Sequence, residues 1–227
     1  MNKLISNLKI KVNSNLYLID PSSSKLGQKI VIHSINLIHE IGFEKFTFRK
    51  LGGVIESPEA SIYRYFKSKD QLLSYLVSWY WGWMEYRLVF STANISSPEI
   101  QLQKVIDLFA IKNKKKEFLD GIDINKLINI IISESPKSYL TKDVTKSNKE
   151  GAYLNYKIFV SRMASIINEI NPDYKTPNML ISTIIEGAHL QFFFAENLLG
   201  LTNKQKSDDY ISIFYKKLAL DTIKSKS

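Results

Sequence analysis

Apolar side chains recur every three or four positions along most of the chain, which is the spacing of amphipathic helices. Residues that favour helix starts and stops divide this pattern into segments. The expected helices lie between Ser24 and Gly42, from Thr47 to the turn at Glu56, from Pro58 to Tyr65, from Ser68 to about Phe90, onward from Ser97, and at 123–135, 145–171, 177–199 and 203–224. The sequence therefore predicts an all-α fold.

Side-chain caps support the first four of these helices. Ser24 and Thr47 stand at N-cap positions, and Ser57 precedes a proline that would occupy the first helical position. Ser68 and Gln71 have the spacing of a capping box.

Residues 1–23 depart from the helical pattern. Residues 8–12 alternate apolar and polar side chains, 13–15 form a turn-like cluster, and 16–19 are again mostly apolar. This pattern favours either a short β-hairpin or a disordered arm.

The two short helices around Glu56, with a further helix on each side, indicate a helix-turn-helix unit. In such a unit the second helix enters the major groove of DNA and the first fixes its angle. Its polar side chains would face base edges, and other donors would bind phosphate oxygens. The expected base-facing residues are Glu59, Ala60, Ser61 and Arg64, and the expected phosphate donors are Thr47, Tyr63, Tyr65 and Lys69.

The segment SIYRYFKSKDQLL (61–73), together with Gly42 and Thr47, resembles the N-terminal domain of the TetR/AcrR family of bacterial transcription regulators. The similarity covers about residues 25–73. It implies a fold of about nine helices, with an arm (1–23), a DNA-binding head (24–70) and an effector-binding and dimerisation domain (71–227). It also places Tyr63 near the bases. The chain would then be a cytoplasmic, ligand-responsive repressor that binds a palindromic operator as a homodimer through its last two helices.

The turn of the unit departs from the family pattern. Glu56 stands where the family usually has glycine, and Gly52 and Gly53 lie inside the preceding helix. A glutamate with positive φ costs on the order of 1 kcal/mol, and each helical glycine costs roughly 1 kcal/mol relative to alanine. An alternative therefore stays open, namely a helical ligand-binding dimer whose DNA-binding head is weakened or lost.

Aromatic residues are concentrated in the C-terminal part. They predict either ordinary core packing or an apolar pocket for an apolar or aromatic effector. The candidate pocket residues are Trp79, Trp83, Tyr86, Phe109, Tyr153, Tyr156, Phe159 and Phe193. The candidate dimer residues are Ile184, Ala188, Gln191, Phe192 and Ala195 on the penultimate helix, and Tyr210, Ile213, Phe214, Lys217 and Leu218 on the last. The alternative is that they form the core of a monomer.

Composition and charge add limits. The net charge is +9, and residues 1–73 carry 11 of the 31 basic and 6 of the 22 acidic residues, so the excess is densest in the predicted head. A composition that is rich in lysine throughout the chain would also produce an excess of basic over acidic residues. The chain has no cysteine and no expected membrane span. No catalytic motif, cofactor site or metal site is expected: Glu186 and His189 lack the second such pair that a di-iron bundle needs.

Overall fold

The computed structural model describes residues 10–112 and 115–225. The described residues form two compact units, a first unit of residues 10–82 and 115–155 and a second unit of residues 83–112 and 156–225. Within the described residues there are eleven α-helices, three short 3-10 helices and one two-stranded hairpin. The all-α prediction is confirmed. The predicted boundary at residue 70 concerns function rather than packing, and it stays a prediction.

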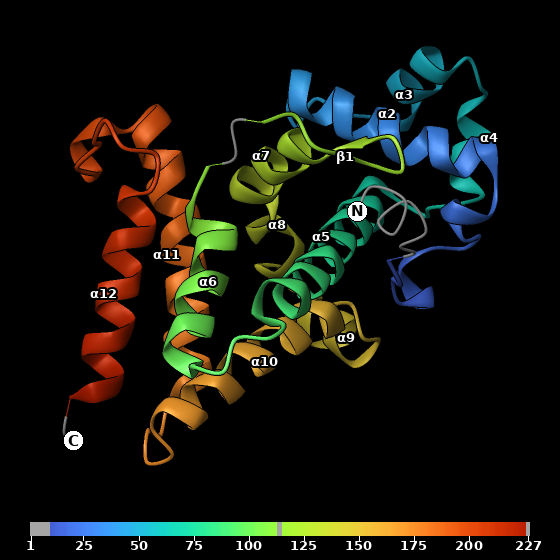
Figure 1. Cartoon of the computed structure of the whole chain (residues 1–227). Coiled ribbons are helices and arrows are strands. Elements are labelled where there is room, and N and C mark those ends of the chain that lie inside the picture. Colours follow the sequence, from blue (N-terminus) through green and yellow to red (C-terminus); the bar gives the residue numbers. More distant parts are fainter. Residues whose placement is uncertain (1–9, 113–114, 226–227) are drawn as a thin grey trace. The chain divides into compact units, whose positions relative to one another are not determined.

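The first unit contains the predicted head, the first half of α5 and three further helices (Figure 1). Helix α2 packs against α3 and α7, and α3 packs against α4. The helices of this unit are α2 (Lys25–Ile41), α3 (Phe48–Ile55), α4 (Glu59–Tyr63), the first half of α5 (Lys69–Thr92), α7 (Ile124–Glu134), α8 (Pro136–Tyr139) and α9 (Val144–Lys149).

Most of the predicted caps form. The Ser24 hydroxyl accepts from the Gly27 N–H at 3.0 Å, and the Thr47 hydroxyl accepts from the Lys50 N–H at 3.2 Å. Ser68 accepts from the Gln71 N–H at 3.1 Å, which confirms one half of the capping box. The third helix differs, because Pro58 itself is its N-cap residue and provides no side-chain bond. Helix α4 therefore begins at Glu59 and is shorter than predicted.

The described part of the N-terminal segment contains no strand, so the hairpin prediction is wrong for residues 10–23; its first residues, 8 and 9, lie outside the described part. The turn cluster instead forms the 3-10 helix η1 (Ser14–Leu16), and η2 (Pro21–Ser23) follows it. Leu16 is buried in the core, and the Leu18 N–H is donated to the Tyr65 carbonyl at 2.8 Å rather than to a strand. Leu16 therefore packs into the core and Leu18 bonds to the head, and these residues do not pair as strands.

In the second unit, α6, α11 and α12 pack against one another (Figure 1). Gly187 allows this packing, because a Cβ there would lie only 2.3 Å from the Tyr215 hydroxyl oxygen. Asp107 on α6 accepts from the Ser212 hydroxyl at 2.6 Å and pairs with Lys216 on α12 at 2.5 Å. The bounds are α6 (Pro98–Ala110), α10 (Leu154–Ile170), α11 (Pro177–Asn197), η3 (Leu199–Leu201) and α12 (Tyr210–Lys224).

Three segments differ from the sequence predictions. The helix expected over 145–171 is divided at Gly151, whose φ is 81°, into α9 and α10. Helix α12 begins seven residues later than expected. Strands β1 (Phe118–Leu119) and β2 (Ile122–Asp123) form an unpredicted hairpin whose two turn residues, Asp120 and Gly121, both have positive φ, as a tight hairpin turn requires.

Candidate nucleic-acid interface

Helices α3 and α4 form the predicted two-helix unit. Leu51 and Ile55 of α3 and Ile62 and Phe66 around α4 are all buried. These four side chains hold the two helices together through apolar contact, as the sequence pattern predicts. The opposite sides of both helices are left to solvent.

The turn between them is tight and closes onto Gly52. Glu56 has φ 54° and ψ 45°, which is the left-handed conformation, so the cost considered above for a glutamate with positive φ applies here. The Glu56 N–H and the Ser57 N–H both donate to the Gly52 carbonyl, the second at 2.9 Å. A Cβ on Gly52 would lie 2.6 Å from the Ser57 carbonyl oxygen, whereas a Cβ on Gly53 would meet nothing within 4 Å. Gly52 is therefore required by the close approach of the turn and is not a sign of a degraded head.

The predicted base-facing side chains lie on the solvent side of α4 and just beyond it. Ala60 and Arg64 are exposed, and Glu59 and Ser61 are half-buried. Tyr63 is 47% exposed, and its ring packs edge-on against Phe48 of α3 with 5.0 Å between centroids. This contact fixes the direction of the Tyr63 ring relative to the first helix of the pair.

Two of the predicted phosphate donors have partners inside the head. Tyr65 is buried and its hydroxyl bonds to the Ser24 hydroxyl at 2.8 Å, so it ties α2 to the end of α4. Burial removes Tyr65 from our set of DNA contacts. Lys69 donates to the Phe43 and Glu44 carbonyls at 3.1 and 3.3 Å and lies over the Phe43 ring. Lys69 therefore holds the loop before α3 in place. These two bonds use two of the three N–H groups of its ammonium.

Three exposed cations of the head were missed by sequence reasoning. Arg49 and Lys50 lie in the first turn of α3 beside Thr47, and Lys67 lies between α4 and α5. A search for basic residues in the first turns of the two helices and in the loop that follows them would have found all three.

The predicted pocket residues are divided between the two units. In the first, Trp79 is buried and the Tyr153 hydroxyl donates to the Ser138 carbonyl at 2.8 Å. In the second, Phe109 and Phe159 are buried with 6.3 Å between ring centroids.

The remaining members of that set all lie in the second unit. Tyr156 donates to Glu186 at 2.9 Å, Arg87 lies over the Trp83 ring, and the Tyr86 ring lies 4.4 Å from that of Phe90. Phe193 is half-buried, with its ring edge-on to Phe194. Phe109 and Phe159 contact each other, and one shared effector pocket stays a prediction.

The predicted dimer residues have two different environments. Ile184, Ala188 and Ala195 of α11 are buried within the protomer, so a partner could not reach them without repacking. On α12, by contrast, large apolar side chains are exposed: Ile213 (56%), Phe214 (59%) and Leu218 (38%). Lys217 is also exposed, and Gln191, Phe192 and Tyr210 are half-buried.

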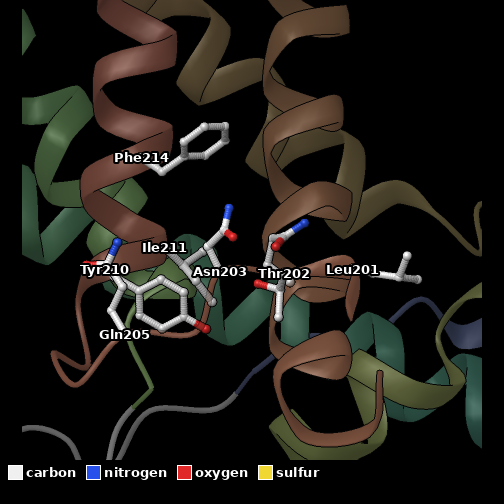
Figure 2. A pocket seen from close by; sticks show the side chains of 8 residues that line it. Leu201, Thr202, Asn203, Gln205, Tyr210, Ile211 and Phe214 are labelled. Carbon is white, nitrogen blue, oxygen red and sulfur yellow. The ribbon is translucent and has the colours of Figure 1, made fainter. Parts of the chain in front are cut away.

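A hollow of about 300 Å³ lies beside this surface, between the end of α11, the loop after it and the start of α12 (Figure 2). Its lining is uncharged and includes Gln191 and Phe214 of the predicted dimer set. The Thr202 hydroxyl oxygen in this lining is buried without a hydrogen-bond partner in the described part of the chain.

No helix of the described residues is long and apolar enough to cross a membrane. The same residues contain no cluster of three or more histidine, aspartate or glutamate side chains that could hold a metal ion.

Comparison with known proteins gives a family match at the head. Residues 33–76 match the model of the bacterial regulatory proteins of the tetR family. No curated protein matches the sequence.

Solved structures show the same fold at low identity. AibR in complex with isovaleryl coenzyme A and operator DNA is 14% identical, with a TM-score of 0.54 over 84% of this chain and 97% of that one. The fatty acid degradation regulator FadR from Bacillus halodurans is 12% identical, with a TM-score of 0.57 over 87% and 94%. The superantigen PfiT is 15% identical, with a TM-score of 0.56 over 92% and 100%. The fold is thus shared by proteins of different function.

Proposed function

We propose that this chain, whose residues 33–76 match the model of the bacterial regulatory proteins of the tetR family, is a ligand-responsive repressor that binds a palindromic operator as a homodimer. The observation that carries the proposal is the intact α3–α4 pair. Its core is buried, its turn is hydrogen-bonded onto Gly52, and its solvent side presents Tyr63 and Arg64. Together these features suit a helix pair whose second helix enters a major groove.

The contacts follow from exposure and chemistry. Arg64 is suited to a guanine edge, Ala60 to a thymine methyl, and the half-buried Glu59 to a cytosine amino group. Thr47, Arg49 and Lys67 are suited to phosphates. Ser61, Tyr63 and Lys69 complete the set, with Lys69 acting mainly on the loop that it closes.

Dimerisation gives the head its operator geometry. Two recognition helices must lie about 34–36 Å apart to read successive major grooves of one duplex face. We place the dimer contact on the exposed apolar side of α12, around Ile213, Phe214 and Leu218, because such a patch would otherwise face water. The hollow beside Phe214 would then be covered by the partner.

The effector is proposed to have an apolar or aromatic body. The aromatic side chains of the second unit, including the buried pair Phe109–Phe159, support this. The AibR structure, which shares the fold, holds isovaleryl coenzyme A, a ligand with a short apolar acyl group. Bound effector would act by favouring a dimer whose recognition helices no longer fit the operator.

The rival proposal is a ligand-binding dimer without DNA affinity. It is favoured by the Glu56 carboxylate, which is exposed at the turn and would lie near a polyanion. Affinity as a function of salt separates the two proposals, because a protein that neutralises phosphates loses affinity with a slope of about −0.9 per phosphate.

The direct test is an Arg64→Ala variant measured on a selected duplex by fluorescence anisotropy. We expect roughly tenfold weaker binding and relaxed sequence preference at one base position. Lys149→Ala, which removes an exposed cation from α9, is the matched control and should bind as the unaltered chain does. Equal losses in both variants would show that only bulk charge acts, and would contradict the proposed role of α4.

A further inference from the structure

The segment formed by residues 10–24 is attached along α5 and to the head. The Asn155 side-chain N–H group donates to the Lys11 carbonyl at 3.0 Å and to the Ser78 carbonyl of α5 at 2.9 Å. The Gln71 amide donates to the Asn15 carbonyl at 3.1 Å. These bonds, with the burial of Leu16, hold the segment in one position on the first unit.

A cavity of about 280 Å³ lies between this segment and α5. Its walls are Ile10, Lys11, Val12, Tyr17, Asp20, Ser22 and Tyr75. The volume is just below the range of about 300–1,000 Å³ that is typical of sites for drug-sized ligands, so the cavity suits a smaller molecule. It shares no residue with the head contacts or with the effector pocket proposed above.

Tyr17, Asp20 and Tyr75 give part of the cavity lining the character of a cation-binding site. The Tyr17 and Tyr75 rings lie edge to face with 6.2 Å between centroids, and Tyr75 is almost fully buried. The Asp20 carboxylate lines the same cavity. Burial raises the pKa of both tyrosines, and the charge of Asp20 adds to this effect. A carboxylate beside aromatic rings attracts an ammonium group.

We propose that this cavity binds a small primary amine with an apolar or aromatic body. The ammonium group lies against Asp20 and the two tyrosine rings, and the body packs on Ile10 and Val12. Lys11 also lines the cavity and is exposed, so it limits the ligand to a single positive charge.

The test is isothermal titration of the full chain, without DNA, with 2-phenylethylamine and with its neutral analogue 2-phenylethanol. We expect saturable binding of the amine and at least tenfold weaker binding of the alcohol. Asp20→Asn should weaken amine binding at least tenfold, and its amide oxygen can still accept from the Ser22 N–H, which keeps the turn intact. Asp143→Asn removes the same charge from an exposed site and is the control that should not change affinity.

Two further variants test the geometry. Tyr17→Leu should weaken binding of the amine, because the variant lacks one of the two rings. Lys11→Gln should strengthen binding of the amine, because it removes a positive charge that repels the ammonium group. Equal affinities for amine and alcohol, an unchanged affinity in Asp20→Asn, or no saturable binding of the amine at millimolar concentration would overturn the proposal. Since no DNA is present, these outcomes are independent of whether the head binds an operator.

Discussion

The two adjacent glycines of α3 provide a sharp test of the turn, because the structure predicts opposite effects for the same substitution. Alanine in place of glycine favours a helix by about 1 kcal/mol at either position. At Gly53 the added methyl group meets nothing within 4 Å, so Gly53→Ala should raise the free energy of unfolding by about 1 kcal/mol.

At Gly52 the added methyl group would lie 2.6 Å from the Ser57 carbonyl oxygen, well inside the 3.4 Å at which ordinary contact begins. That oxygen belongs to the main chain of the turn and cannot rotate away. Relief requires the turn to open, which costs about 1–3 kcal/mol for the overlap and about 1 kcal/mol for the bond from the Ser57 N–H to the Gly52 carbonyl. After the helix gain, Gly52→Ala should lower the free energy of unfolding by about 2 kcal/mol.

The assay is urea and thermal unfolding of both variants followed by circular dichroism. One kcal/mol shifts Tm by roughly 2–4 °C in a chain of this size, so the two variants should melt on opposite sides of the unaltered chain. If Gly52→Ala were as stable as Gly53→Ala, the Ser57 carbonyl oxygen would not lie close to position 52. Glycine would then not be required at that position.

Other variants test the strain, the buried histidine and the dimer surface. Glu56→Gly should stabilise the chain by about 0.5–1 kcal/mol in the same melts by relieving the positive φ, whereas Glu56→Gln should not, because only the charge changes. Burial lowers the pKa of His189 to about 4 from its usual 6.5, so the unfolded chain binds the proton first and stability should fall as the pH drops between those values. The fall is up to about 3 kcal/mol in urea titrations, and His189→Gln should lack this component. Phe214→Glu should reduce the proposed dimer to a monomer in light scattering, whereas Leu140→Glu, at a still more exposed apolar site of the first unit (78% against 59%), should leave the proposed dimer intact.

The helical pattern and the caps were predictable from the sequence because they depend on local spacing. Thr47, Ser24 and the Ser68–Gln71 pair act within one turn of chain, and each forms its bond. The division of the 145–171 helix was not predicted, because it depends on the positive φ of Gly151. The sequence alone does not show whether an isolated glycine in a helical pattern has a positive or a negative φ.

Features that depend on long-range packing could not be predicted from the sequence. The alternation of residues 8–12 and the apolar run at 16–19 suggested paired strands, but Leu18 pairs with Tyr65 of the head instead. Tyr65 itself looked like a phosphate donor by its place in a polar motif. Its burial and its bond to Ser24 follow from the position of α2, which periodicity alone does not give.

The central claim is that the α3–α4 head reads a specific duplex. The most direct test is selection of binding sites from a randomised duplex pool, followed by titration of the enriched site at two salt concentrations. We predict a palindrome with two half-sites about one helical turn apart, bound tightly and with an affinity that falls steeply with salt. If no sequence were enriched and binding stayed weak at low salt, the head would not be a functional DNA-binding domain, and the account of a ligand-binding dimer would replace it.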